Sequence, residues 1–351
     1  MTMKHLVVLI SFSALSASLV PLAAAPTEDE VDAAIHRGLD YLQAAQESDG
    51  AFGGGYGKTT ALPALAAMAC LATGHVPGDK RYGDMIDKAL DYILAHHDES
   101  GYFGHAQHGK MYAHAISTLF LTEVSGMVSK ERQAEIDAIL PKAVKVILDA
   151  QNVKKFGKDN IGGWRYQPNS HDSDTSCSGW CLMALRSARH NGAPVPPEAI
   201  NRAVEYIHRF HNREIGSFGY THPSVPSVTL SGAGILCLEL CGRHEDPDSM
   251  RAAKYLMGMY RDPDKGMVKQ DHQSYGLYYA SQGLFQIGGE NWKEFSAWMY
   301  ETFLAKQKDD GSWPHDRAVP SPVYTTAMTI LAFAVPYRQL PVYQRDETVD
   351  E

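Results

Sequence analysis

The chain has 351 residues, with 32 Lys and Arg against 41 Asp and Glu and a formal net charge of −9. This acidic balance, without a basic cluster, argues against a nucleic-acid partner. The five cysteines lack the paired C-x-x-C spacing of metal sites. We therefore expect no metal site and no cofactor, and we expect the cysteines to be small buried side chains of helices.

Residues 1–25 have the pattern of a secretory signal peptide. Lys4 and His5 precede an apolar run from Leu6 to Leu22, and three alanines follow at 23–25. Small residues after a short apolar run are typical of a cleavage site, whereas a retained membrane anchor requires a longer apolar segment. The sequence therefore predicts an exported protein, periplasmic or secreted, without a transmembrane helix after cleavage.

Between residues 26 and 336, one unit recurs six times. It consists of an amphipathic helix, a turn of glycine and usually an aromatic residue, a polar loop and a more apolar helix. Successive gaps between the leading glycines are 51, 61, 54, 50 and 45 residues. A period of this length indicates a repeat architecture. The leading glycines are Gly50, Gly101, Gly162, Gly216, Gly266 and Gly311.

The two helices of each unit differ in their apolar pattern. In the first helix of the chain, Val31, Ile35 and Leu39 form one stripe, as expected for an outer helix half exposed to water. The second helices, such as 61–71 and 232–240, are apolar on nearly all sides, which is typical of burial. Six such pairs predict an all-α fold, an (α/α)6 toroid. An open solenoid is the alternative, but neither end has a polar capping repeat. A C-terminal tail (337–351) is expected along the surface.

The turns resemble a known repeat. Gln307 to Trp313, preceded by Phe303, is similar to the QW repeat of squalene-hopene cyclases, and Gln46 to Phe52 is a looser copy. The glutamine is expected to bond backbone amides of the turn, and the aromatic ring to pin one unit to the next. The resemblance covers the whole chain after residue 25. It implies a single-barrel member of the terpenoid cyclase and protein prenyltransferase superfamily, with the α/α-toroid fold.

Two activities of this superfamily can be compared residue by residue. Triterpene cyclases protonate their substrate with an Asp-x-Asp-Asp-Thr motif at the start of an inner helix. Aligned on Asp174 and Thr175, this sequence has His171 at the first aspartate and Ser173 at the proton donor. Only the final Asp-Thr matches the motif. The two replacements argue against true triterpene cyclisation.

Prenyltransferase β subunits bind zinc through Asp-x-Cys-x-x-x-Trp and a distant histidine. Anchored on Trp180, the aspartate is Asp174, but Ser176 takes the place of the cysteine and Tyr279 that of the histidine. Catalytic zinc requires three protein ligands. The resemblance therefore implies no zinc prenyl transfer.

In a toroid, the loops that precede the inner helices gather at one end, where this sequence concentrates His, Asp and Tyr. Any one of these residues can simply cap a helix, but their recurrence predicts a ligand-binding mouth suited to proton transfer. The candidate catalytic residues are Asp172, Asp174 and His171. The candidate ligand-binding residues are His105, Trp164, Tyr166, His222, Asp271, His272, Tyr279, His315 and Asp316, with Tyr112, Tyr220, Tyr275 and Tyr324 nearby.

Three functions stay open at this point. The first is a module that binds a small-molecule or saccharide ligand at the mouth without turnover. The second is an exported polysaccharide lyase or hydrolase that uses the same mouth. The third is terpenoid cyclase-type acid catalysis by Asp174. A deep, dry, aromatic cavity favours terpenoid chemistry, whereas an open polar groove favours a saccharide.

Overall fold

The computed structural model describes residues 26–53, 57–104 and 110–344. The predicted signal peptide and His105 lie outside these residues. The described chain forms twelve α-helices and one short hairpin, in which β1 (His211–Asn212) pairs with β2 (Ser217–Phe218). None of its helices has the length and hydropathy needed to cross a membrane.

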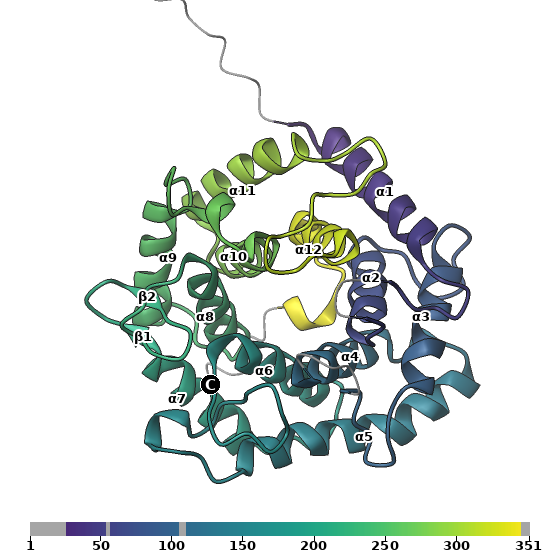
Figure 1. The fold of residues 1–351 in the computed structure, drawn as a ribbon, viewed down its shortest axis with the longest axis horizontal. Helices are drawn as coiled ribbons and strands as arrows, with labels where there is room; N and C mark the ends of the chain where they lie inside the picture. Colours follow the sequence, from purple (N-terminus) through teal and green to yellow (C-terminus); the bar gives the residue numbers. More distant parts are fainter. Residues whose placement is uncertain (1–25, 54–56, 105–109, 345–351) are drawn as a thin grey trace, which may run out of the picture.

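The helices alternate between two concentric rings (Figure 1). The outer ring comprises α1 (Glu28–Ala45), α3 (Gly83–Ala95), α5 (Lys130–Asn152), α7 (Pro197–Arg209), α9 (Pro247–Met259) and α11 (Gly289–Leu304). The inner ring comprises α2 (Ala61–Ala72), α4 (Lys110–Val124), α6 (Thr175–His190), α8 (Val228–Leu240), α10 (Gln273–Ile287) and α12 (Pro322–Phe333). Both rings close, because α12 packs against α2 and α11 contacts α1. The predicted (α/α)6 toroid is confirmed, and the open solenoid is excluded.

Burial explains the different sequence patterns of the two rings. In α7, Ile200, Val204 and Ile207 form one buried stripe, while every residue of α8 is buried. The inner helices therefore supply most of the core, and the outer helices cover it with one face each. All five cysteines are buried and unpaired, as expected for small apolar side chains.

The turn glycines allow close contact between neighbouring units. Five of the six leading glycines have φ between +84° and +92°, a conformation that glycine adopts at little cost. A Cβ atom at any of the five would lie within 2.1–3.0 Å of an atom in the next outer helix. The exception is Gly266, with φ −67°, which precedes a 3-10 helix at Met267–Lys269. The fifth unit thus uses a different turn.

A glutamine at the end of α1, α5 and α11 ties each of these units to the next. Gln307 Nε2 donates to the carbonyl of Gly311, at 2.9 Å, and to that of Ala34 in α1, at 2.8 Å. Gln46 and Gln151 make the equivalent pair of bonds. The expectation that the glutamine bonds backbone amides of the turn was wrong. Its side-chain amide donates to backbone carbonyl groups instead. The Gln307 pair joins the last unit to the first.

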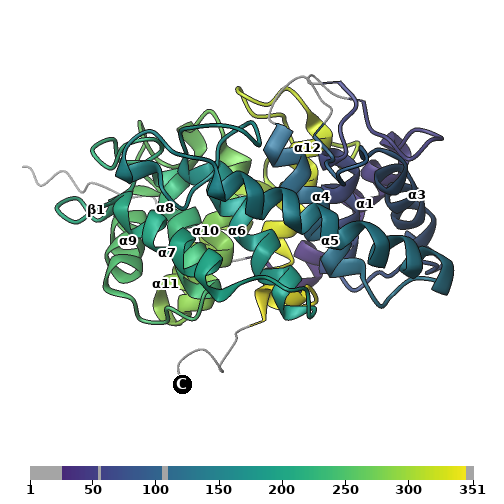
Figure 2. The same cartoon turned by 90° about the horizontal axis from the view of Figure 1, so that it is seen from below.

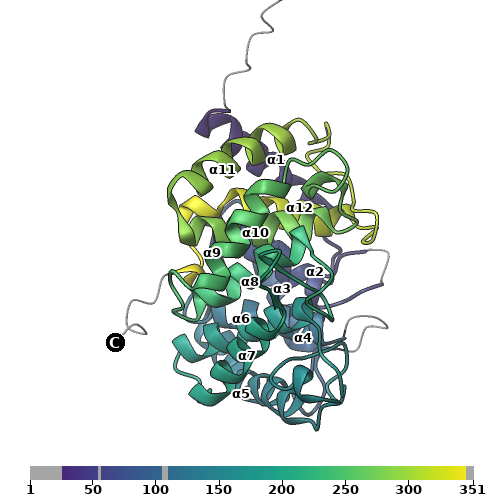
Figure 3. The ribbon, with the colours of Figure 1, turned by 90° about the vertical axis from the view of Figure 1, so that its left-hand side faces the viewer.

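The C-terminal tail lies inside the ring, which corrects its expected place on the surface. Leu340 and Tyr343 are buried, and residues 340–344 occupy the middle of the ring in Figure 1. Tyr343 bonds the hydroxyl of Tyr278 in α10, and the Val342 amide donates to Glu123 Oε2 at 3.0 Å. The side views place this segment on the side opposite the loops that precede the inner helices (Figures 2 and 3). One end of the toroid is therefore closed by its own chain.

Candidate functional site

A central cavity of about 690 Å³ opens at the end of the toroid where the turn loops meet the inner helices. All six inner helices contribute to it from their N-terminal halves. Representative lining residues, in chain order, are Ala61, Tyr112, Ser176, Thr229, Tyr275 and Tyr324. The cavity therefore lies where the sequence places the ligand-binding mouth.

The lining is largely aromatic and aliphatic. Five tyrosines and Trp180 surround the cavity, together with seven leucine, isoleucine, valine and alanine residues and several serines and threonines. Among the described lining residues, the ionisable groups other than tyrosine are Asp271 and His272. The mouth is thus less rich in His and Asp than the sequence indicates. The tyrosines are Tyr112, Tyr166, Tyr220, Tyr275 and Tyr324.

Asp174 is fully buried directly behind the cavity wall. As the N-cap of α6, its Oδ1 accepts the Cys177 amide at 2.7 Å. The same oxygen accepts the Ser176 hydroxyl at 2.6 Å, and Oδ2 lies 3.3 Å from Arg165 Nη1. Burial raises the pKa of Asp174 above its usual value, although these hydrogen bonds and the Arg165 charge oppose the shift. The site therefore favours the protonated form more than water does.

Two hydroxyl groups connect Asp174 to the cavity. Ser176 Oγ lies 2.5 Å from the hydroxyl of Tyr112, and both residues line the cavity. Because Ser176 donates to Asp174, Tyr112 donates to Ser176 in the ionised state. When Asp174 carries the proton, reversing both hydroxyls gives a path from the carboxyl group to the Tyr112 oxygen.

Asp172 and His171 lie on the outer surface of the same loop. Asp172 is exposed and pairs with Arg165 Nε at 3.3 Å. His171 Nδ1 bonds the carbonyl of Lys154 at 2.7 Å, and its ring stacks on Phe156. Neither residue is among those that line the cavity. Asp174 reaches the cavity through the hydroxyl of Ser176, whereas Asp172 reaches it through Arg165, which bonds the hydroxyl of Tyr220.

Arg165 joins the two aspartates to a pair of tyrosines. Its guanidinium group lies 4.6 Å from the ring centre of Tyr166 and 5.4 Å from that of Tyr220. The two tyrosine hydroxyls bond each other beside it. A cation placed over the face of an aromatic ring is attracted to that ring. Arg165 thus holds the tyrosines at one edge of the cavity while neutralising Asp174.

The fifth and sixth units place one aspartate at the cavity and one beneath the surface. Asp271 lines the cavity and pairs with Arg317 at 2.8 Å, and His272 lines it at the start of α10. Asp316 is buried, and its Oδ2 accepts the backbone amide and the hydroxyl of Ser274 at the start of α10. His315 Nδ1 contacts the Asp316 carbonyl and does not line the cavity.

Trp164, His222 and Tyr279 lie away from the cavity lining. Trp164 is fully buried and donates from Nε1 to the Ile147 carbonyl at 2.8 Å, so it packs its unit together. His222 bonds Ser224 within its own exposed loop. Tyr279 is buried behind Trp180, with ring centres 5.6 Å apart.

Sequence reasoning missed two features of the cavity. Trp180 is not among the predicted site residues, yet its side chain lines the cavity. Ser176, weighed only as a replacement for a zinc-binding cysteine, links Asp174 to Tyr112. Their position could have identified both residues, since each lies in the first two turns of an inner helix. Among the described residues, the cluster with metal-ligand spacing is His208, Asp246 and Asp248, between α7 and α9.

The comparison with solved structures supports the fold. No family model and no curated protein matches the chain. The structure is similar to the type II terpene cyclase MstE from Scytonema, with a TM-score of 0.57 and 14% identity over 90% of this chain and 100% of that one. A variant of that cyclase was solved in complex with its substrate, geranylgeranyl dihydroxybenzoate.

Two further neighbours are of a different kind from the cyclase. A reducing end xylose-releasing exo-oligoxylanase has a TM-score of 0.57 and 11% identity, covering 90% of this chain and 93% of that one. A possible member of the GH105 family from Salmonella enterica has a TM-score of 0.57 and 13% identity, covering 94% and 99%. At such identities the likeness shows the fold alone. The protein is an α/α toroid of the kind that terpene cyclases and these proteins share.

Proposed function

We propose that the protein binds an elongated apolar ligand of the isoprenoid class in its central cavity. The observation that carries this proposal is the lining of aromatic and aliphatic side chains. A volume of about 690 Å³ lies within the range of ligand pockets, roughly 300–1,000 Å³. Burial of apolar surface supplies the binding energy, and the tyrosine hydroxyls orient any polar end of the ligand.

A saccharide-cleaving function has less support from the site. A glycoside hydrolase needs two carboxyl groups that face each other across the bound sugar. Among the described residues, Asp271 is the carboxylate that lines the cavity, and it is engaged by Arg317. Asp172 and Asp316 are both held elsewhere, by Arg165 and Ser274. An apolar ligand is therefore the better match, although the structural neighbours include both kinds of protein.

The path from Asp174 to Tyr112 supports a second function, acid catalysis on the bound ligand. A protonated Asp174 passes its proton to Ser176 Oγ, Ser176 passes its own proton to Tyr112, and Tyr112 donates to a double bond of the ligand. The aspartate ends as a carboxylate stabilised by Arg165 and the Cys177 amide. A raised pKa of Asp174 suits a general acid.

Ligand binding is tested by titrating the protein without residues 1–25 with geranylgeraniol and, separately, with xylotetraose. Tryptophan fluorescence reports occupancy because Trp180 lines the cavity. Ala61→Phe narrows the cavity and is expected to weaken geranylgeraniol binding by about tenfold or more. Ala45→Phe, at the end of outer helix α1, is the matched control and is expected to bind normally. Saturable binding of xylotetraose alone would contradict the proposal.

Acid catalysis is tested with geranylgeranyl dihydroxybenzoate as the probe and mass spectrometry of the products. Asp174→Asn keeps a helix-capping side chain but removes the acid, so turnover should fall by about 100-fold or more while binding persists. Tyr112→Phe should have the same effect, and Asp172→Asn should have none. Bound but unconverted probe in the wild type would reject acid catalysis on this probe and leave the binding function intact.

A further inference from the structure

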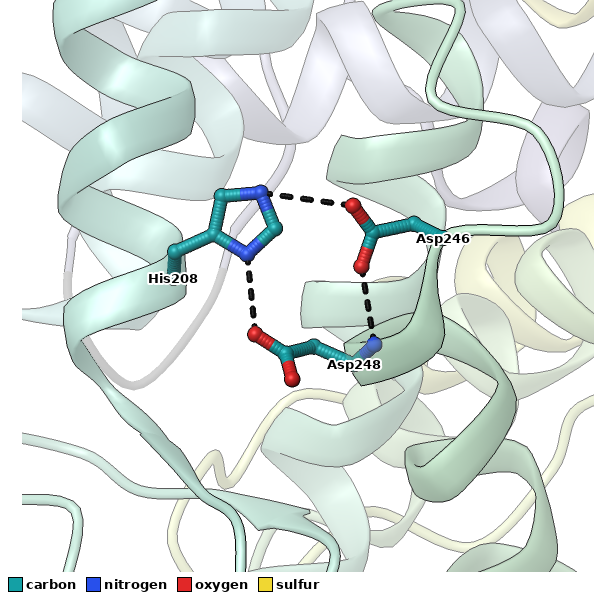
Figure 4. Close-up of side chains that lie close together, drawn as sticks. All are labelled: His208, Asp246 and Asp248. Atoms are coloured by element: carbon teal, nitrogen blue, oxygen red, sulfur yellow. Dashed lines mark hydrogen bonds and ion pairs between the residues drawn. The ribbon is translucent and has the colours of Figure 1, made fainter.

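A second group of side chains converges on the outside of the toroid, where α7 ends and α9 begins (Figure 4). His208, in the last turn of α7, has Nδ1 3.0 Å from Asp248 Oδ2 and Nε2 3.5 Å from Asp246 Oδ2. Asp246 is the N-cap of α9, and one of its carboxylate oxygens accepts the Asp248 amide at 2.8 Å. One imidazole therefore meets two carboxylates from a different helix.

The spacing of these groups suits a small cation. One ligand atom from each of His208, Asp246 and Asp248 lies within 4.8 Å of the other two. Ligand atoms at the corners of a zinc tetrahedron are about 3.4 Å apart, given bonds of about 2.1 Å. A metal ion binds one nitrogen of an imidazole, so His208 would contribute either Nδ1 or Nε2, with ligand atoms of the three residues now within 4.8 Å of one another. Closure to this separation requires rotation of His208 and Asp246, whose side chains are 29% and 15% exposed, around the buried Asp248.

A buried histidine beside the cluster provides an independent observation. The side chain of His211, in β1, is 0% exposed, and its Nδ1 lies 3.1 Å from Asp248 Oδ1. Neither ring nitrogen has an aligned hydrogen-bond partner among the described residues. A buried polar group left in this state destabilises the folded protein. Because it lies against Asp248 Oδ1, this imidazole can hold the carboxylate in place while Oδ2 faces His208.

The surrounding charges leave room for a cation. Arg251 Nη1 lies 2.8 Å from Asp248 Oδ1, and Arg213 Nε lies 3.7 Å from the same oxygen. Both arginine side chains are substantially exposed, at 47% and 77%, so their charge is screened by water and they can turn away. An open pocket next to the cluster is lined by His208 and Asp246, with Glu205 and Arg243 as its other charged residues.

We propose that His208, Asp246 and Asp248 form a zinc-binding site that ties α7 to α9, with the buried His211 holding Asp248 in place from its other oxygen. One imidazole and two carboxylates suit zinc, whereas magnesium and calcium prefer oxygen ligands throughout. The site lies on the outer ring and does not involve the central cavity. It adds a cross-link between the fourth and fifth units, next to the turn at Gly216.

The test uses the protein without residues 1–25 and without a histidine tag, stripped with a chelator and titrated calorimetrically with zinc chloride. We expect one equivalent of zinc per chain and no comparable binding of magnesium chloride. His208→Asn should weaken zinc binding by at least tenfold. Asp246→Ser should do the same while keeping a good helix cap. His190→Asn, an exposed histidine of α6, is the matched control and should bind like the wild type.

Thermal unfolding monitored by circular dichroism provides a second measurement. Zinc should raise the midpoint of the wild type and of His190→Asn, but not that of the two cluster variants. Equal zinc uptake by the wild type and both cluster variants would overturn the proposal, since the metal would then be bound by other histidines. The proposal also fails if the stripped wild type takes up no zinc. Circular dichroism without zinc shows whether each variant is folded.

Discussion

The closure of the ring is open to a direct test at Gly311. This glycine begins the last turn, with φ +86°, and a Cβ atom there would lie 2.2 Å from the carbonyl oxygen of Arg37 in α1. The substitution Gly311→Ala therefore forces the last unit away from the first. Gly74 provides the matched control, because its φ is +85° but a Cβ atom there would meet nothing within 4 Å.

The two substitutions separate two costs. Alanine at positive φ costs about 1–2 kcal/mol, and this cost applies to both positions. At Gly311, Cβ also meets backbone atoms, so the turn and α1 must move apart by about 1 Å. Displacements of this kind in a packed structure cost about 1–3 kcal/mol more. Gly311→Ala should thus lower the free energy of unfolding by about 2–5 kcal/mol, against about 1–2 kcal/mol for Gly74→Ala.

Urea unfolding followed by far-ultraviolet circular dichroism measures both changes. The wild type, Gly311→Ala and Gly74→Ala are compared at the same pH and temperature, by their midpoints and slopes. A clearly lower midpoint for Gly311→Ala than for Gly74→Ala supports contact across the ring closure. Equal losses in the two variants would refute the argument, because only the backbone conformation would then matter.

Three further changes concern the tail and the ring. Burial raises the pKa of Glu123 to about 7, against hydrogen bonds from Ser187 and the Val342 amide. The folded state then holds the proton more tightly than the unfolded state, so wild-type stability should fall by about 3 kcal/mol as pH rises from about 4.5 to about 7. Glu123→Gln should abolish that slope in urea unfolding at pH 5 and pH 8. Gln307→Ala removes two hydrogen bonds at the ring closure and should lower the free energy of unfolding by about 2 kcal/mol. A smaller loss than for the control Gln344→Ala would contradict this role. Tyr343→Ala empties the closed end of the toroid and should cost about 3 kcal/mol, whereas an unchanged midpoint would mean that the tail contributes little.

The repeat is visible in the sequence because it rests on local requirements. Glycine at 50, 101, 162, 216 and 311 is needed for a backbone conformation and for a close approach that other residues prevent. The contrast between half-apolar and fully apolar helices follows from the number of faces that each helix buries. Both patterns can be counted along the chain, so the number of units and the two rings could be predicted without coordinates.

The site was only partly predictable, because neighbours in sequence separate in space. Asp172 and Asp174 are two residues apart, yet the first is exposed and the second is enclosed behind Ser176. The difference arises because Asp174 is the N-cap of α6 and turns its side chain toward the helix, while Asp172 remains in the loop. Residue type and spacing identify the loop, and the path of the backbone decides which carboxyl group connects to the cavity.

What the sequence alone determined is the repeating unit, the two classes of helix and the end of the toroid that holds the cavity. Tertiary structure alone decided the place of the tail and the meeting of His208 with Asp246 and Asp248. Tyr343 reaches Tyr278 from 65 residues away, and His208 reaches Asp248 across 40 residues. Contacts at such separations depend on how the rings close, and neither periodicity nor motif spacing contains that information.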